Sequence, residues 1–126
     1  MMRLIPAAFL SFLFLSCQSP ALAGPSQGDM DKAYELNLQA MVEMSEAKFE
    51  EAVDHFRQAV QLVPDYGITG KPFIYSPTFM AGWGLEKIGN DREACAEFKA
   101  YLTRTGNQAE ATKRDHADAF IKSHCK

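Results

Sequence analysis

Apolar residues recur at helical spacing through the first half of the chain. Between Asp29 and Pro64 there is no Gly or Pro, and apolar side chains return every three or four positions. This spacing predicts amphipathic α-helix. The apolar stripe is interrupted from Ser45 to Lys48, which favours two helices joined by a turn over a single helix of 34 residues. The apolar positions are Leu36, Ala40, Met44, Phe49, Ala52, Val53, Phe56, Ala59, Val60 and Val63.

A second segment repeats part of this pattern 42 residues further along the chain. Repeated offsets indicate a repeated helical hairpin, because stacked hairpins need small residues where their helices cross closely. We therefore predict hairpins at about residues 30–64 and 77–105. The coinciding positions are Glu51-Ala52 with Glu93-Ala94, Phe56-Arg57 with Phe98-Lys99 and Val60 with Leu102, while Ala40 and Gly82 each lie 12 residues before Ala52 and Ala94.

A last amphipathic helix is predicted from Gln108 to His124. Gly106 ends the second hairpin, and Asn107 suits the N-cap of the helix that follows. This helix lacks the repeated pattern and is otherwise polar, as expected of a helix that caps the apolar end of a stack. The expected fold is all-α, with five helices and no sheet. One side of the last helix carries Ala109, Thr112, His116, Ala119 and Phe120.

Both hairpins carry a motif of small and aromatic residues. The first contains Ala52-x3-Phe56-x2-Ala59-x4-Pro64, and the second contains Ala94-x3-Phe98-x2-Tyr101 after the segment Trp83 to Asp91. These motifs resemble tetratricopeptide repeats over about residues 33–106. In such hairpins the small residues let the two helices approach, Phe56 fills the space between them, and Pro64 stops the second helix.

The chain departs from the tetratricopeptide pattern at three points. Glu43 stands where the family usually has an aromatic residue, and Gly106 replaces a terminating Pro. The period is 42 residues rather than about 34, so about eight extra residues lie within Asp65–Ser76. This insertion is rich in Gly, Pro and aromatic residues and is predicted to be a loop. Loops that interrupt a repeat are often functional.

The N-terminus is predicted to be a signal peptide of residues 1–23. A single basic residue, Arg3, precedes an apolar run over residues 4–15, and Ala21-Leu22-Ala23 follows. A basic start, a short apolar run and an A-x-A site are typical of a secretory signal. The run of about 12 residues is too short to span a bilayer as a helix, and a buried core helix is the alternative. Cleavage leaves residues 24–126 as a mature domain that we expect in the periplasm.

The segment Phe14-Leu15-Ser16-Cys17 offers a second processing route. It resembles the lipobox of bacterial lipoproteins, in which the Cys becomes the lipidated first residue. Leu15 and Ser16 fit that motif, whereas Phe14 stands where an aliphatic residue is preferred. Cys17 is therefore a lipidation candidate, and an outer-membrane lipoprotein is the alternative to a soluble periplasmic protein. Membrane contact is expected only if Cys17 is lipidated.

Length, composition and charge restrict the possible classes. The 126 residues suffice for one domain, and a chain that is 47% hydrophobic and 23% charged is typical of a globular protein. A net charge of −3 argues against a nucleic-acid partner. The charge is uneven, because residues 24–66 hold nine Asp/Glu and three Lys/Arg while residues 85–126 hold seven and eight. The first hairpin is therefore the more acidic.

Two cysteines, Cys95 and Cys125, lie in the predicted mature domain. An oxidising compartment makes them candidates for a disulfide, which would close a ~30-residue loop and add roughly 3 kcal/mol. If the helices were straight and antiparallel, the two residues would be offset by about 12 Å along the helix axes. The bridge therefore requires the tail to fold back or the last helix to start late. Free or intermolecular thiols are the alternative.

The sequence contains no recognisable catalytic or cofactor-binding motif. His55, His116 and His124 do not share a metal-ligand spacing. Paired acids such as Glu50-Glu51 lie at predicted helix starts, where they stabilise the helix. We therefore expect no enzymatic activity, no cofactor and no metal site.

The resemblance to tetratricopeptide repeats also implies a binding surface. In that family the first helix of each hairpin lines a concave groove that binds a protein or peptide. Met and aromatic side chains suit such an adaptable docking surface. The alternative is that Phe79 and Trp83 pack beneath the insertion and the last helix. The candidates are Tyr34, Asn37, Met41 and Met44 from the first hairpin and Phe79, Trp83, Glu86 and Lys87 from the second.

These observations predict a non-enzymatic module of the bacterial cell envelope that binds a protein or peptide through its groove and the inter-repeat loop Asp65–Ser76. Two alternatives stay open at this point. The first is a lipidated outer-membrane assembly factor anchored through Cys17. The second is a periplasmic redox or metal-handling protein that uses Cys95, Cys125 and a nearby His.

Overall fold

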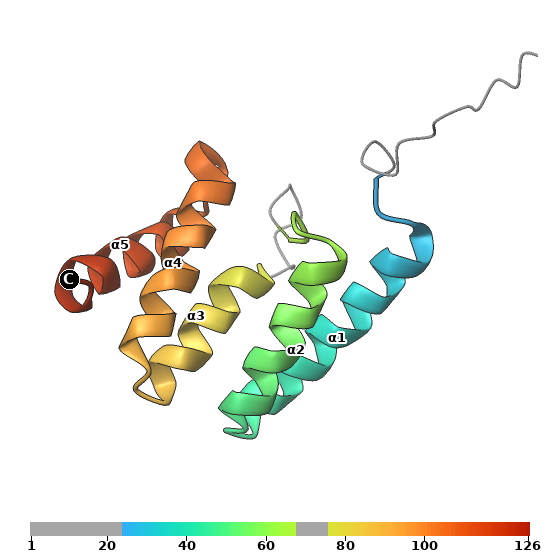
Figure 1. Cartoon of the computed structure of the whole chain (residues 1–126), viewed down its shortest axis with the longest axis horizontal. Helices are drawn as coiled ribbons and strands as arrows, with labels where there is room; N and C mark the ends of the chain where they lie inside the picture. The colour runs from blue at the N-terminus through green and yellow to red at the C-terminus, as the bar shows by residue number, and fades with distance from the viewer. Residues whose placement is uncertain (1–23, 68–75) are drawn as a thin grey trace, which may run out of the picture.

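The protein is built from helices that follow one another along the chain. The computed structural model describes residues 24–67 and 76–126, and neither stretch contains a β-strand. The all-α prediction is confirmed. The predicted signal peptide, Cys17 and most of the predicted insertion lie outside the described residues. The helices are α1 (Gln27–Ser45), α2 (Phe49–Leu62), α3 (Pro77–Lys87), α4 (Asp91–Thr105), the short 3-10 helix η2 (Gly106–Gln108) and α5 (Ala111–His124) (Figure 1).

The first two helices begin and end where local chemistry predicts. Ser26 caps α1 in a capping box, with its hydroxyl accepting from the Asp29 N–H at 3.1 Å. The turn between α1 and α2 places Ala47 at a φ of 59°, which confirms the predicted break at Ser45–Lys48. Pro64 follows the C-cap residue Val63 directly, so the predicted stop of α2 is also confirmed.

The second pair of helices is also bounded by residues suited to their positions. Pro77 occupies the start of α3, where its missing N–H costs no helical hydrogen bond. The turn after α3 contains Gly89 at a φ of 77°, a conformation that L side chains rarely adopt. The Asn90 side chain then caps α4, accepting from the Glu93 N–H at 3.3 Å and donating to the Glu93 carboxylate at 2.7 Å.

The last helix begins later than predicted. Gly106 has a φ of 52° and opens η2, so α5 starts at Ala111 rather than Gln108, and its N-cap is Glu110 rather than Asn107. The buried side of α5 agrees with the predicted one only in part. Ala109, Ala117 and Phe120 are buried and His116 is half-buried, whereas Thr112 and Ala119 are exposed.

Each helix packs mainly against the next one in sequence, so that the five α-helices form a stack (Figure 1). The main core runs from α1 to α5, and its largest fully buried side chains include Phe56, Met80 and Phe98. Ala40 and Ala52 are completely buried at the contact between α1 and α2, as predicted. No helix in the described part of the chain is both long and apolar enough to cross a membrane. A smaller apolar cluster at the other end of α1 and α2 contains Ala33, Leu36, Ala59, Val63 and Tyr66.

Two glycines let α3 approach both of its neighbours. A Cβ atom on Gly82 would lie 2.9 Å from the Phe98 ring of α4, and one on Gly84 would lie 2.7 Å from Cγ2 of Val53 in α2. Real Cβ atoms essentially never come that close to another heavy atom. The glycines therefore define how closely α2, α3 and α4 pack.

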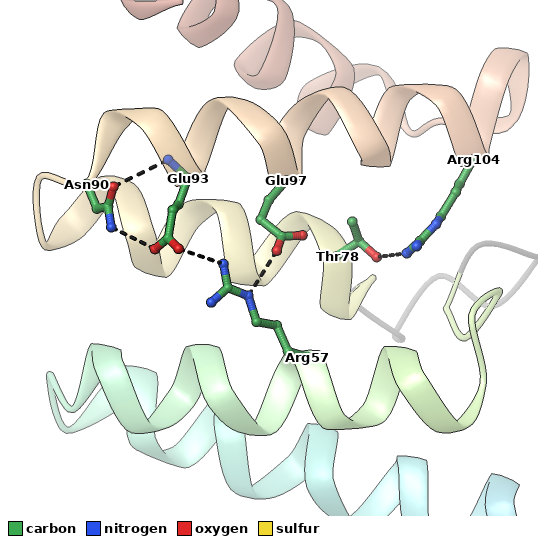
Figure 2. A network of polar contacts seen from close by, with 6 residues as sticks. All are labelled: Arg57, Thr78, Asn90, Glu93, Glu97 and Arg104. Carbon is green, nitrogen blue, oxygen red and sulfur yellow. Dashed lines mark hydrogen bonds and ion pairs between the residues drawn. The ribbon is translucent and has the colours of Figure 1, made fainter.

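Polar contacts link the second helices of the two predicted hairpins directly (Figure 2). Arg57 of α2 donates from Nε to the Glu97 carboxylate at 3.0 Å and lies 3.9 Å from the Glu93 carboxylate, both on α4. Arg104 of α4 donates to the Thr78 hydroxyl of α3 at 2.9 Å. On the other side of α2, His55 contacts the Glu43 carboxylate of α1. Glu43 is the position at which the tetratricopeptide pattern usually has an aromatic residue. Polar contacts therefore join α1 to α2, α2 to α4 and α3 to α4.

The close contact at Gly84 makes a testable prediction. Gly84→Ala should destabilise the fold by about 1–3 kcal/mol through overpacking, partly offset by up to about 1 kcal/mol from the better helix propensity of Ala. In a Val53→Ala background the clashing methyl is absent, so the same change should be neutral or stabilising. Urea denaturation of the four proteins measures this coupling.

Gly28→Ala is the matched control, because a Cβ there meets only the Ser26 hydroxyl at 3.7 Å. It should stabilise the protein slightly. An equal effect of Gly84→Ala in both backgrounds would contradict the proposed contact.

Candidate functional site

A cleft of about 300 Å³ lies between α3 and the beginning of α5. Its floor comes from α3, and its other wall comes from residues at and after the N-cap of α5. The two helices belong to separate parts of the sequence, so the cleft exists only because α5 folds back over α3 and α4. The lining residues are Phe79, Met80, Trp83, Glu110, Thr112, Lys113 and His116.

Aromatic rings form the floor of this cleft. Phe79 is at the centre of the cluster, with ring centroids at 5.3 Å from Tyr101, 5.6 Å from Phe98 and 5.8 Å from His116. It is only 6% exposed, so it acts as core rather than as a free docking residue. Trp83 lies 6.5 Å from Phe79 and is half-buried, so part of its indole faces the cleft.

A histidine–carboxylate pair connects the two walls. Nε2 of His116 on α5 lies 2.7 Å from the Glu86 carboxylate on α3. An ionised carboxylate can only accept, so the imidazole N–H donates. The same imidazole makes edge-to-face contacts with the rings of Phe79 and Phe98. His116 therefore joins the apolar floor to the polar rim.

Charged groups surround the mouth of the cleft. The Glu110 carboxylate lies 3.0 Å from the Lys113 ammonium and accepts from the Thr112 hydroxyl at 3.0 Å. These two hydrogen bonds, the one from Lys113 first, hold the pKa of Glu110 below its ordinary value. On the α3 side, the Lys87 ammonium lies 5.7 Å from the centroid of the Trp83 ring, within cation–π range.

The structure separates the predicted groove residues into two groups. Phe79 and Trp83 line the cleft, and Glu86 and Lys87 contact His116 and Trp83 at its edge. The four candidates on α1 do not line it. Asn37 is buried, and its Oδ1 has no hydrogen-bond partner within the described residues. Met41 and Met44 pack against the main core, and Tyr34 is 51% exposed.

Sequence reasoning did not identify the wall supplied by α5. It treated the last helix as a cap and assigned no role in partner binding to Glu110, Lys113 or His116. A usable signal was present, because these residues recur every three positions and so fall along one side of a helix.

Cys95 and Cys125 form a disulfide, with their Cα atoms 5.9 Å apart. The predicted offset of the two cysteines along the helix axes assumed straight antiparallel helices on either side of a turn at Gly106. In the structure α5 starts at Ala111 and lies inclined to α4 (Figure 1), which brings the residue after its last turn back to Cys95. We had predicted that the bridge requires either a tail that folds back or a last helix that starts late, and the structure shows the late start. The disulfide fastens the end of α5 to α4.

The histidines near the disulfide have other partners. His116 contacts Glu86, and the His124 ring stacks on Phe120 with centroids 4.5 Å apart. Within residues 24–67 and 76–126, no three His, Cys, Asp or Glu side chains are placed to hold a metal ion together.

Comparison with known proteins does not assign the chain to a family. No family model matches it, and no curated protein and no solved structure is significantly similar to it. Membership of the tetratricopeptide family therefore stays a prediction from the sequence motifs.

The disulfide should contribute strongly to stability. Because it closes a loop across 30 residues, replacing both Cys95 and Cys125 by Ser should lower the free energy of unfolding by about 3–4 kcal/mol. Urea denaturation of both proteins, with and without a reducing agent, measures the difference. The reductant should destabilise only the wild type, and an equal effect on the double variant would show that the bridge is not its target.

The rim makes a prediction about pH. Carboxyl NMR titration should give Glu110 a pKa below its ordinary 4.5. Lys113→Met should raise that pKa, because it removes the hydrogen bond that lowers the pKa most. Since the folded-state pKa is lowered, this group stabilises the fold above its ordinary pKa, and the contribution is lost as pH falls through the folded value. Thr112→Val should shift the pKa in the same direction. An ordinary pKa in the wild type would contradict the rim contacts.

Proposed function

We propose that this protein is a non-enzymatic binding module of the bacterial cell envelope that holds a protein or peptide partner in the cleft between α3 and α5. The observation that carries the proposal is the half-buried Trp83, which presents an aromatic surface beside polar groups from a second helix. Exposed faces of Trp are typical of the few residues that dominate binding energy in interfaces.

The size and chemistry of the cleft favour a peptide. A volume of about 300 Å³ lies at the small end of ligand sites, which suits one large side chain of a longer chain. An apolar or aromatic side chain would pack on the half-buried Trp83. The Glu110 carboxylate and the Thr112 hydroxyl oxygen at the rim can accept hydrogen bonds from N–H groups of the peptide backbone.

The sequence supports the location and the finer architecture of this proposal. The predicted signal peptide directs the chain to an oxidising compartment, and the Cys95–Cys125 disulfide is consistent with such a compartment. The motifs around Phe56 and Phe98 support two tetratricopeptide-like hairpins with α5 as a cap. The lipobox-like segment at Cys17 supports a second form of the proposal, in which the same module is tethered to the outer membrane.

Selection from a random peptide library displayed on phage would test the cleft directly. Peptides selected on the wild type should lose at least about 2 kcal/mol of affinity, roughly 30-fold, on Trp83→Ala. Folding stability should fall by less than the ~3–5 kcal/mol expected for a fully buried Trp. Anisotropy titration gives the affinities, and thermal unfolding gives the stabilities.

Ile88→Ala is the control, because Ile88 is an exposed apolar residue just after α3 that does not line the cleft. It should leave peptide affinity unchanged. A collapse in stability on Trp83→Ala with affinity preserved would assign Trp83 to the core and place binding elsewhere.

A further inference from the structure

One face of α1 exposes a line of large apolar side chains. Five such side chains are strongly exposed in the described part of the chain, and four of them are on α1. They are spaced four residues apart, so they follow a single ridge about 18 Å long on the helix surface. This α1 stripe consists of Met30, Tyr34, Leu38 and Val42, which are 37%, 51%, 48% and 55% exposed.

The α1 stripe points away from the protein's own core. Ala33, Leu36 and Ala40, on the other side of α1, are buried, and α2 is the helix that packs most closely against it. The helices between the ends of the stack each pack against two neighbours. Among the described residues, α5 at the opposite end exposes no large apolar side chain. The two ends therefore differ, and only the α1 end exposes the kind of surface that a further helix normally covers in a stack.

The surroundings of the stripe are acidic. Asp31 and Glu35 are exposed and follow Met30 and Tyr34 by one position, which places them along one border of the stripe. Lys32 is the only basic residue on α1, and its ammonium lies 3.8 Å from the Glu35 carboxylate. Residues 24–66 as a whole contain nine acids and three Lys/Arg. A second copy of this chain would bring a like-charged border to the contact, whereas a basic partner would complement it.

We propose that the α1 stripe binds an amphipathic helix of another protein, whose apolar face is flanked by Lys and Arg. A ridge with four-residue spacing fits the corresponding groove of another helix at a crossing angle of about −50°. The four side chains are anchors for the apolar face, and Asp31 and Glu35 pair with the basic flank. This surface is separate from the cleft at Trp83 and does not depend on it.

The test uses the full chain and a fluorescent helical peptide of ~18 residues, with Leu along one face and Lys on both flanks, which spans about 27 Å. A second peptide carries Glu in place of every Lys. The Lys peptide should bind at least roughly tenfold more tightly than the Glu peptide at low salt, and the difference should shrink as salt is added. Fluorescence anisotropy measures both affinities.

Variants identify the surface that binds. Leu38→Ser should lower the affinity for the Lys peptide at least roughly tenfold. The thermal midpoint should stay near the wild-type value, because Leu38 is half exposed. The Asp31→Asn, Glu35→Gln double variant should reduce the preference for the Lys peptide. Ile88→Ser, at the fifth exposed apolar position, and Trp83→Ala, in the cleft, should leave binding unchanged.

Several results would overturn this proposal. Equal binding of the two peptides would remove the charge argument, and full affinity in Leu38→Ser would move the contact off the stripe. A concentration-dependent dimer in sedimentation velocity that Leu38→Ser dissolves would make a second copy the occupant. If Trp83→Ala is the only variant that abolishes binding of the Lys peptide, the peptide binds in the cleft instead. The two surfaces are therefore distinguishable in one set of proteins.

Discussion

The arrangement of the helices depends on how closely α3 packs between α2 and α4. Gly82 meets the Phe98 ring on one side, and Gly84 meets a Val53 methyl on the other, at separations that leave no room for a Cβ atom. Because α3 has no side chain at these two positions, α2 and α4 come near enough for Arg57 to reach the carboxylates of Glu93 and Glu97 (Figure 2). The same packing directs Phe79 and Trp83 toward α5.

The candidate cleft depends in turn on where α5 is held. Its middle is joined to α3 through the His116–Glu86 pair, and its end is joined to α4 through the Cys95–Cys125 disulfide. Between these points Phe120 packs on Phe98, with ring centroids 5.1 Å apart. A covalent bond that needs an oxidising compartment therefore supports one wall of the proposed binding site, which connects the predicted export of the chain to its proposed activity.

The two ends of the stack have different surface chemistry. The α5 end combines a covered aromatic core with a small cleft whose rim carries both signs of charge. The α1 end carries an uncovered apolar ridge with an acidic border. The proposed cleft and the proposed contact on α1 would therefore let one module bind two partners at opposite ends of its stack.

The sequence by itself determined the helices and most of their ends, because these depend on residues a few positions apart. Apolar spacing predicted α1 to α4, the break at Ser45–Lys48 and the stop at Pro64, and the small residues at Ala40, Ala52 and Gly82 marked the close crossings. Only the tertiary structure decided the start of α5, the pairing of Cys95 with Cys125, the burial of Phe79 and the α5 wall of the cleft. Each of these depends on contacts between segments 20 or more residues apart or on the direction in which one helix crosses another. Local periodicity shows which residues share one side of a helix, but it does not show which other segment that side contacts, so the tertiary structure had to decide these points.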